Sequence, residues 1–148
     1  MNRLYEVLVF EEGMRTDPYV CSEGYVTIGI GTKLHNSPNI DPRDFCLRVS
    51  EKAARALLED EVDRIRLLLA SELDGLDVDV QTILLSMAYQ MGVRGLLGFR
   101  KMWAALKAGD RATAAYEALD SQWARQTPAR ANRHADVISG IPLSQVYP

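Results

Sequence analysis

Hydrophobic residues follow two spacings along the chain, one typical of helices and one typical of a β-hairpin. Apolar positions recur every three or four residues, as on one face of an α-helix, in residues 2–12, 51–73, 80–91, 100–108, 111–119 and 128–139. Several of these segments are followed by a glycine, which is common just beyond the C-terminus of a helix. The pattern therefore predicts a mostly helical chain of the α+β class.

Between Tyr19 and Thr32 the apolar residues recur at every second position, which predicts strands. One face is formed by Val26, Ile28 and Ile30, and Ser22-Glu23-Gly24 supplies the turn of a hairpin before it. The other face carries Thr27, which need not be buried, together with Gly29 and Gly31. Glycines within a strand indicate that another backbone or a ligand comes close to that face.

The segment 51–73 is the longest predicted helix, with Ser50 as its N-cap. At about 1.5 Å per residue it spans about 30 Å, the diameter of a small domain. It could therefore join two lobes of one domain formed by residues 1–148. We expect a small lobe of about residues 13–58, a linking helix of about 51–73, and a helical lobe of about 1–12 plus 70–148.

The composition, 47% hydrophobic and 25% charged in 148 residues, is close to the average for globular proteins. A domain of this length buries roughly 70% of the surface of its unfolded chain, so we expect no cofactor and no metal to be needed. The longest apolar stretches are only a few residues, which argues against membrane insertion. A net charge of −3 does not indicate a nucleic-acid partner. Bases nevertheless outnumber acids between residues 94 and 133, either as solvated helix faces or as a surface for an anionic polymer.

The N-terminal residues do not resemble a secretory signal, because Glu6 interrupts the apolar pattern. Cys21 and Cys46 are therefore expected to be free thiols in a reducing compartment. Cys46 lies beside Phe45 and Leu47, which favours a buried position for it.

Glu12 is the first candidate for chemistry, because it lies at the C-terminal end of the first predicted helix. The helix dipole and a partly apolar setting from Phe10 and Met14 both disfavour the ionised carboxylate, which suits a proton donor. If the helix end packs on the hairpin, Glu12, Cys21 and Thr27 can line one cleft. Taken singly, each also has an ordinary interpretation: a solvated glutamate, a small core cysteine and a β-forming threonine.

The spacing of these three residues resembles the catalytic constellation of phage lysozymes of glycoside hydrolase family 24. In that family a glutamate is followed after eight residues by aspartate or cysteine, and after five more by threonine, as Glu12, Cys21 and Thr27 are here. The surrounding sequence is also similar, notably Glu23-Gly24-Tyr25 and Thr27-Ile28-Gly29-Ile30-Gly31. Farther along, Tyr89-Gln90-Met91-Gly92 and the segment 123–131 resemble the family's C-terminal lobe. The resemblance extends from Glu6 to Gly140 and is weakest over residues 36–79.

The resemblance implies a two-lobed lysozyme-like fold with a three-stranded hairpin lobe and a catalytic cleft between the lobes. It implies a phage endolysin that hydrolyses the β-1,4 bond between N-acetylmuramic acid and N-acetylglucosamine in peptidoglycan, so that the host cell lyses. Glu12 would be the general acid, and the residue at Cys21 would position or activate the attacking group on the other face of the sugar. Thr27 would hydrogen-bond the nucleophilic water.

The resemblance also implies a substrate-binding set in the C-terminal half. Tyr89 and Gln90 would line the cleft and bind sugar, although Tyr89 could equally be core packing. Arg130 would orient Glu12, its alternative being a surface arginine.

For the biology, the resemblance implies a monomer whose partner is the peptidoglycan polymer, with no nucleic acid involved. The carboxylates of that polymer would suit the basic C-terminal half. The enzyme would accumulate in the host cytoplasm and depend on a holin to reach the periplasm.

The cysteine at position 21 is the main departure from the aspartate found in many relatives. A thiol is largely neutral at neutral pH, so the electrostatic role of a carboxylate does not carry over to it. Two other functions stay open: a catalytically inactive sugar-binding protein, and a thiol hydrolase that uses Cys21 with His35 or His134. The second is disfavoured, because Cys21 lies in a turn and not at a helix N-terminus, where a thiolate is stabilised.

Overall fold

The computed structural model describes residues 3–148 and confirms a mostly helical α+β chain with one small antiparallel sheet. The chain forms two compact units, one of residues Tyr5–Arg64 and one of residues 3–4 with Ile65–Pro148. The sequence pattern assigns residues 1–12 to the helical lobe, whereas residues 5–12 belong to the unit that contains the sheet. Contacts within that unit account for the difference, since the guanidinium of Arg55 lies over the ring of Tyr5.

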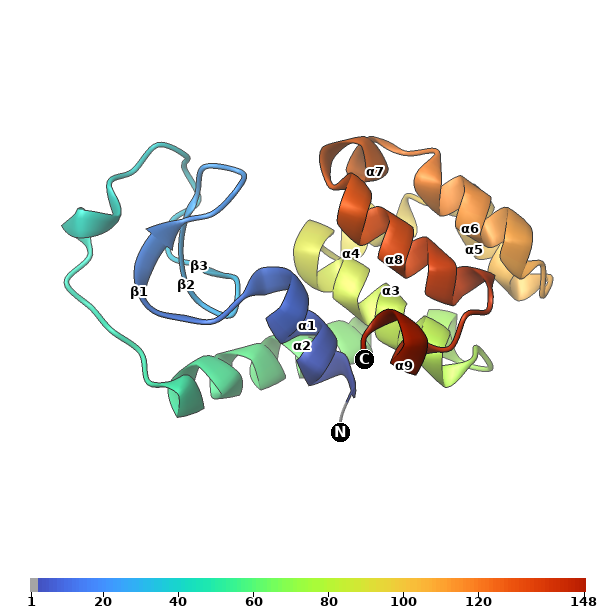
Figure 1. The fold of residues 1–148 in the computed structure, drawn as a ribbon, viewed down its shortest axis with the longest axis horizontal. Helices are drawn as coiled ribbons and strands as arrows, with labels where there is room; N and C mark the ends of the chain where they lie inside the picture. Colours follow the sequence, from blue (N-terminus) through green and yellow to red (C-terminus); the bar gives the residue numbers. More distant parts are fainter. Residues whose placement is uncertain (1–2) are drawn as a thin grey trace. The chain divides into compact units, whose positions relative to one another are not determined.

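The first unit contains helix α1 (Arg3–Glu12) from Tyr5 onward. The strands β1 (Arg15–Val20), β2 (Val26–Gly29) and β3 (Thr32–Lys33) follow, drawn in blue in Figure 1. Helix α1 matches the predicted one apart from Asn2, which lies outside the described residues. The strands are antiparallel in the order β1-β2-β3, with Thr27 opposite both Tyr19 and Lys33. Strand β2 is therefore central, and it is buried along its whole length.

Gly29 allows a helix to approach the central strand. A Cβ atom built at this position would lie 3.1 Å from the Cβ of Ala54, and the backbone has a φ of +65° that favours glycine. Ala54 lies in α2 (Glu51–Leu73), so glycine at this position keeps the strand and the first turns of the helix in close contact. The buried apolar residues of this unit include Val7, Leu8, Val26, Ile28, Ile30 and Leu58.

The segment between β3 and α2 runs over the surface and contains one short 3₁₀ helix, η1 (Pro42–Asp44). Asp41 caps η1 by accepting from the backbone N–H of Arg43 at 2.9 Å, and its carboxylate also pairs with the Arg43 guanidinium at 2.7 Å. Helix α2 then begins as predicted, because Ser50 Oγ accepts from the backbone N–H of Ala53 at 3.0 Å. It ends before Gly75, whose φ is +77°.

The second unit is helical throughout its regular structure. After the end of α2 it contains α3 (Val78–Met91), α4 (Val93–Leu97), α5 (Arg100–Lys107), α6 (Arg111–Leu119), α7 (Gln122–Gln126), α8 (Pro128–Ser139) and α9 (Leu143–Val146). The prediction is confirmed for α3, α5, α6 and α8, and the bounds of α6 and α8 agree residue for residue. Thr127 occupies the N-cap position of α8, but its hydroxyl donates to the carbonyl of Trp123 and makes no side-chain cap bond.

Helix α8 is the centre of this unit, packing against α3, α6, α7 and α9. Its buried face includes Arg130 and His134 among apolar neighbours such as Ala131, Val137 and Ile138. Two polar side chains thus lie in the apolar core beside α3. Within residues 3–148, none of the helices combines the length and the apolar character that a membrane span requires.

Candidate functional site

Glu12 is the last residue of α1, and its carboxylate lies against the backbone of Gly31. A Cβ atom at Gly31 would lie 2.9 Å from Glu12 Oε2, closer than real Cβ contacts come. The φ of Gly31 is +72°, which also favours glycine. The sequence predicts that another backbone or a ligand comes close to the glycine-bearing face, whereas at Gly31 the group that comes close is the Glu12 side chain.

Tyr19 connects Glu12 to Cys21 electrostatically. Burial raises the pKa of the Tyr19 phenol above its usual value, and the negative charges of Glu12 and then of Cys21 raise it further. The Arg15 guanidinium, 4.9 Å from the centre of the Tyr19 ring, lowers the pKa of the phenol. The structure thus brings Glu12 and Cys21 within electrostatic range of one phenol, which the sequence interpretation missed. Its position could have identified Tyr19 as a neighbour of the site, since Tyr19 directly faces Thr27 in the hairpin.

Cys21 follows β1 and opens the hairpin turn, as the sequence predicts. Its backbone is held by two hydrogen bonds: its N–H donates to the carbonyl of Tyr25, and its carbonyl accepts from the N–H of Gly24, both at 2.9 Å. The side chain is half-buried and its thiol is free. The position of the sulfur is therefore set by the turn and does not depend on a disulfide.

Thr27 is buried, with 1% of its surface exposed, which corrects the expectation that it need not be. The reason is that β2 is buried along its whole length, so both of its faces are covered. Its hydroxyl donates to the carbonyl of Tyr25 at 3.0 Å. Because that donor is used, Thr27 Oγ1 can only accept a hydrogen bond from a water molecule.

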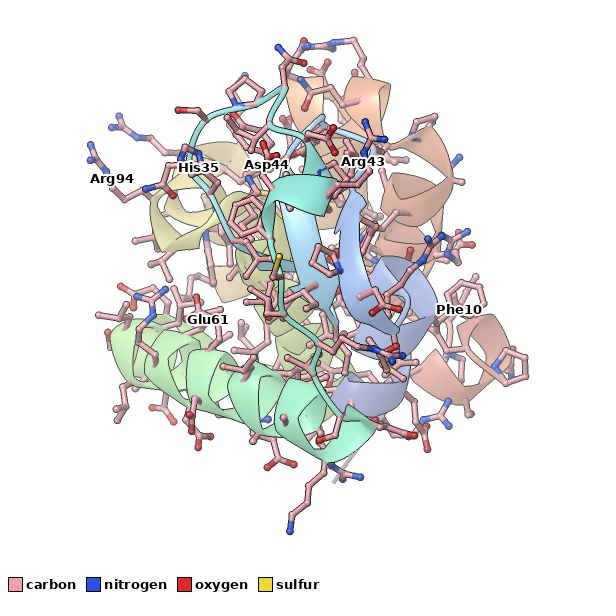
Figure 2. All side chains as sticks on the ribbon, turned by 90° about the vertical axis from the view of Figure 1, so that its left-hand side faces the viewer. Phe10, His35, Arg43, Asp44, Glu61 and Arg94 are labelled. Atoms are coloured by element: carbon pink, nitrogen blue, oxygen red, sulfur yellow. The ribbon has the colours of Figure 1, made fainter. Side chains whose placement is uncertain are left out.

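Phe10 does not provide the apolar setting expected around Glu12. Its side chain is 63% exposed and projects outward from α1 in Figure 2. The orientation of the helix explains this, since Val7 and Leu8 occupy the buried face. The Glu12 carboxylate lies instead against the Gly31 backbone and within electrostatic range of the Tyr19 phenol.

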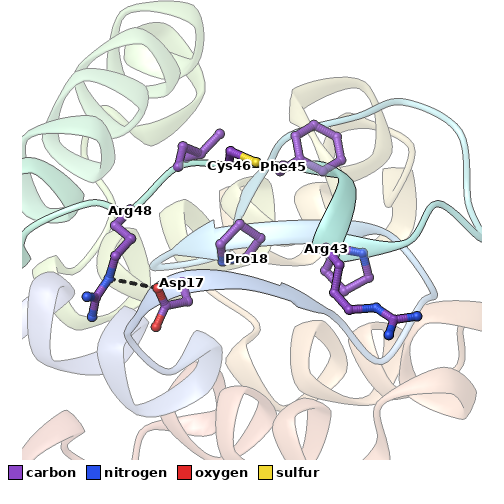
Figure 3. A pocket seen from close by; sticks show the side chains of 8 residues that line it. Asp17, Pro18, Arg43, Phe45, Cys46 and Arg48 are labelled. Atoms are coloured by element: carbon purple, nitrogen blue, oxygen red, sulfur yellow. Dashed lines mark ion pairs between the residues drawn. The ribbon is translucent and has the colours of Figure 1, made fainter.

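A pocket of about 550 Å³ lies elsewhere in the first unit, between β1 and the segment around η1 (Figure 3). Its lining includes Pro18, Phe45 and Cys46, and an ion pair of 2.8 Å joins Arg48 to Asp17. Cys46 is exposed in this segment, which corrects its predicted burial: the segment runs over the surface, so apolar sequence neighbours do not cover the thiol. The candidate catalytic residues do not line this pocket.

Tyr89 and Gln90 lie near the C-terminal end of α3, and both are half-buried. Gln90 Oε1 accepts from the indole N–H of Trp123 at 2.7 Å. The Trp123 ring is itself fixed edge-on against Phe99, with 6.1 Å between the ring centres. The amide of Gln90 is therefore oriented, and its NH₂ group remains the donor available to a sugar oxygen.

Arg130 is buried, with 6% of its surface exposed, so its interpretation as a surface arginine is wrong. Its Nη2 donates to the carbonyl of Ser86 at 3.2 Å and to Ser86 Oγ at 3.0 Å. These contacts come from α3, on which Gln90 also lies. The helix pair α3–α8 thus holds the substrate-binding candidates of the second unit.

His134 also contacts Ser86. Its Nε2 lies 3.0 Å from Ser86 Oγ and its Nδ1 lies 2.9 Å from the hydroxyl of Tyr147. Burial lowers the pKa of His134 well below its usual value, and the charges of Arg130 and Arg133 lower it further. A fully buried, neutral imidazole with both nitrogens engaged is unsuited to activate a thiol. His35 is engaged too, its Nδ1 accepting from the backbone N–H of Ser37 at 3.0 Å.

The six candidate residues thus form two sets, each contained in one unit. Glu12, Cys21 and Thr27 come together around Tyr19, and Tyr89, Gln90 and Arg130 lie on α3 and α8. Over residues 3–148, no group of three or more His, Cys, Asp or Glu side chains is arranged to hold a metal ion. The chemistry these residues offer is proton donation by a carboxyl group and water binding by a hydroxyl.

Comparison with known proteins places these residues in a family. The family model described as phage lysozyme matches residues 10–137. The pre-baseplate central spike protein of Enterobacteria phage T4 is 30% identical over 154 residues, which cover 90% of this chain and 27% of that protein. Probable T4-type lysozyme 1 of Dictyostelium discoideum is 28% identical, covering 93% of this chain and 94% of the relative. Probable T4-type lysozyme 2 of the same organism is 26% identical, covering 98% of each.

Proposed function

Because the chain belongs to the phage lysozyme family and is a glycosidase of the lysozyme type, we propose that Glu12 is the general acid of its reaction. The bond cleaved is the β-1,4 bond between N-acetylmuramic acid and N-acetylglucosamine in bacterial peptidoglycan. The biological role is that of a phage endolysin, which lyses the host cell.

The observation that carries the proposal is the carboxylate of Glu12 lying against Gly31, in the same electrostatic surroundings as Tyr19 and Cys21. Cleavage of a glycosidic bond passes through a state resembling an oxocarbenium ion, with an acid at the leaving oxygen and an attacking group on the opposite face. A carboxyl group fixed at a helix end and a second polar group on the adjacent turn supply this pair.

In the proposed reaction, Glu12 transfers its proton to the glycosidic oxygen, and the electron pair of the breaking bond remains on that oxygen. Water then attacks the anomeric carbon and loses one proton, which restores the protonated carboxyl group through solvent. Thr27 Oγ1 accepts a hydrogen bond from this water, and Cys21 positions or activates it. The products are a saturated N-acetylmuramic acid reducing end and a free hydroxyl on N-acetylglucosamine.

The second unit supplies substrate binding and positioning in this proposal. The ring of Tyr89 stacks on a sugar face, and the oriented amide of Gln90 donates to a sugar hydroxyl. Arg130, held by Ser86, serves as the positioning residue for Glu12.

The family match supports the endolysin role. The test is whether the enzyme lyses cells only after the inner membrane has been permeabilised. The enzyme would stay in the host cytoplasm until a holin opens the inner membrane. Expression in a Gram-negative host should leave the culture turbid until the membrane is permeabilised. Lysis without permeabilisation would contradict dependence on a holin.

The catalytic assignment is tested by a matched pair of variants. Glu12→Gln should abolish the release of muropeptides from purified peptidoglycan while leaving the circular dichroism spectrum unchanged, because the amide keeps the shape of the side chain but has no acidic proton to transfer. Glu11→Gln is the control and should have a mild effect. Mass spectrometry of the products identifies the reaction: saturated reducing ends indicate hydrolysis, whereas anhydro-muramic acid would overturn it.

A further inference from the structure

A line of hydrogen bonds in the second unit runs from Arg130 to the C-terminal segment. Arg130 Nη2 donates to Ser86 Oγ at 3.0 Å, Ser86 Oγ lies 3.0 Å from His134 Nε2, and His134 Nδ1 lies 2.9 Å from the Tyr147 hydroxyl. All four side chains are buried. The carbonyl of Tyr147 in turn accepts from the guanidinium of Arg3, so the far end of the line is anchored as well.

The chemistry of the groups fixes the direction of the first bond and favours one direction for the other two. A guanidinium only donates, so Ser86 Oγ accepts from Arg130. The hydroxyl proton of Ser86 is then available to His134 Nε2, and the lone pair of that nitrogen points toward the positive charge. In that tautomer the imidazole proton is on Nδ1 and donates to the Tyr147 oxygen. Each group then donates to the next one along the line, starting from the Arg130 guanidinium. In this arrangement neighbouring hydrogen bonds strengthen one another.

We propose that Ser86 and His134 are positioning residues for Arg130, with His134 acting through the Ser86 hydroxyl. This inference rests on the proposed function, in which Arg130 serves the general acid Glu12. An arginine side chain has many rotamers, and a buried one keeps a single rotamer only where its donors are satisfied. The Ser86 hydroxyl rotates freely unless a second partner fixes it, and His134 Nε2 is that partner.

Two substitutions of His134 separate positioning from simple packing. The amide of glutamine reaches the place of Nε2 and keeps a partner for Ser86, whereas the shorter asparagine reaches the place of Nδ1 and leaves Ser86 without one. His134→Asn should lower kcat on soluble peptidoglycan fragments by about tenfold, the equivalent of one net hydrogen bond, with little change in KM. His134→Gln should recover most of that loss. Equal losses of kcat in the two variants would overturn the proposal.

A double-mutant cycle tests whether His134 acts through Ser86. Ser86→Ala removes the shared hydroxyl and should lower kcat about as much as His134→Asn, and the double variant should lose no more than either single one. Ser139→Ala is the control, because this exposed serine on the same helix bonds only its own turn and kcat should not change. Losses that add in the double variant would show that His134 acts by another route.

Nitrogen NMR of the wild-type imidazole provides a readout that needs neither activity nor a stable variant. The proposal requires the neutral Nδ1–H form of His134, with Nε2 unprotonated. The Nε2–H form or a protonated ring at neutral pH would overturn the proposal and leave the proposed function untouched. Absence of muropeptide release by the wild-type protein would overturn the proposed function instead.

Discussion

Gly31 illustrates how a residue without a side chain can make room for a proposed catalytic group. The Glu12 carboxylate occupies the space that a Cβ atom at position 31 would need, with Oε2 only 2.9 Å away. A glycine in this motif therefore does more than permit a turn, because it also leaves room for the proposed general acid. The sequence indicates a close approach at these glycines but not which group makes it, since that group lies earlier in the chain on α1.

Gly31→Ala should lower both stability and turnover, whereas Gly24→Ala should lower stability alone. Both glycines have positive φ, so each substitution should cost roughly 1–2 kcal/mol of unfolding free energy. Only the new methyl group at position 31 displaces Glu12, because the nearest atom to a Cβ at position 24 is 4.0 Å away. Urea titration and kcat measured side by side test this. Equal kcat in the two variants would show that Glu12 tolerates displacement.

Cys21 should behave as a group that takes part in the reaction and not as a spacer. Cys21→Asp should keep substantial activity, because a carboxylate can take a proton or carry negative charge at this position, while Cys21→Ala and Cys21→Ser should lose most of it. Steady-state rates on purified peptidoglycan provide the comparison. An active Cys21→Ala enzyme would leave the chemistry to Glu12, Thr27 and water alone.

Alkylation of Cys21 needs a background without the other thiol, because Cys46 is exposed and would react as well. In a Cys46→Ser variant, iodoacetamide should still inactivate the enzyme, and bound oligosaccharide should slow the loss of activity. Retained activity after complete modification of Cys21 would place this thiol outside the reaction.

At the scale of elements, helices are predicted correctly where an apolar repeat runs over several turns and a capping residue or a glycine marks the helix end. Helix α2 has both a long apolar repeat and a serine that caps it, and α6 and α8 have the predicted bounds. Helices α4, α7 and α9 were missed because segments of four or five residues are too short to show a repeat of 3.6. Such helices are specified by contacts that form only in the folded chain.

The cap of α2 should have a measurable effect on stability. Ser50→Ala removes the oxygen that accepts from the N–H of Ala53 and should lower the free energy of unfolding by about 1 kcal/mol. Ser71→Ala, near the other end of the same helix, is the matched control and should be neutral or slightly stabilising, because alanine favours helix interiors. Equal midpoints of urea unfolding in the two variants would show that the cap contributes little.

At the scale of the whole molecule, the sequence identified the residues that match the family motif but not the partners that hold them. Arg130 and Ser86 are 44 residues apart, and Trp123 and Gln90 are 33 apart. Pairs at such separations follow no spacing rule, since they form only when α7 and α8 pack beside α3. The burial of Thr27 was missed for a similar reason, because alternation along one strand does not reveal that both faces of that strand are covered.

Stability of the whole chain should fall as pH drops below about 6.5, the usual pKa of histidine. His134 is neutral in the folded protein because burial, and then the charges of Arg130 and Arg133, lower its pKa well below 6.5. In the unfolded chain the same imidazole takes up a proton near pH 6.5, so the unfolded state binds more protons in the interval below it. The stabilisation is therefore fully present above pH 6.5 and is lost on going down toward the lowered pKa.

The loss should approach about 1.4 kcal/mol of unfolding free energy for each pH unit within that interval. Urea unfolding at pH 7.5, 6.5 and 5.5 measures it, and His134→Gln provides the comparison because an amide does not titrate. The chain has two histidines, and His35 is exposed, so the buried imidazole is the histidine expected to give this slope. The wild-type protein should lose more stability than His134→Gln between pH 6.5 and 5.5. Parallel pH profiles for the two proteins would mean that the folded state accommodates a charged imidazole. In that case the hydrogen bond from Ser86 to His134 would have the opposite direction.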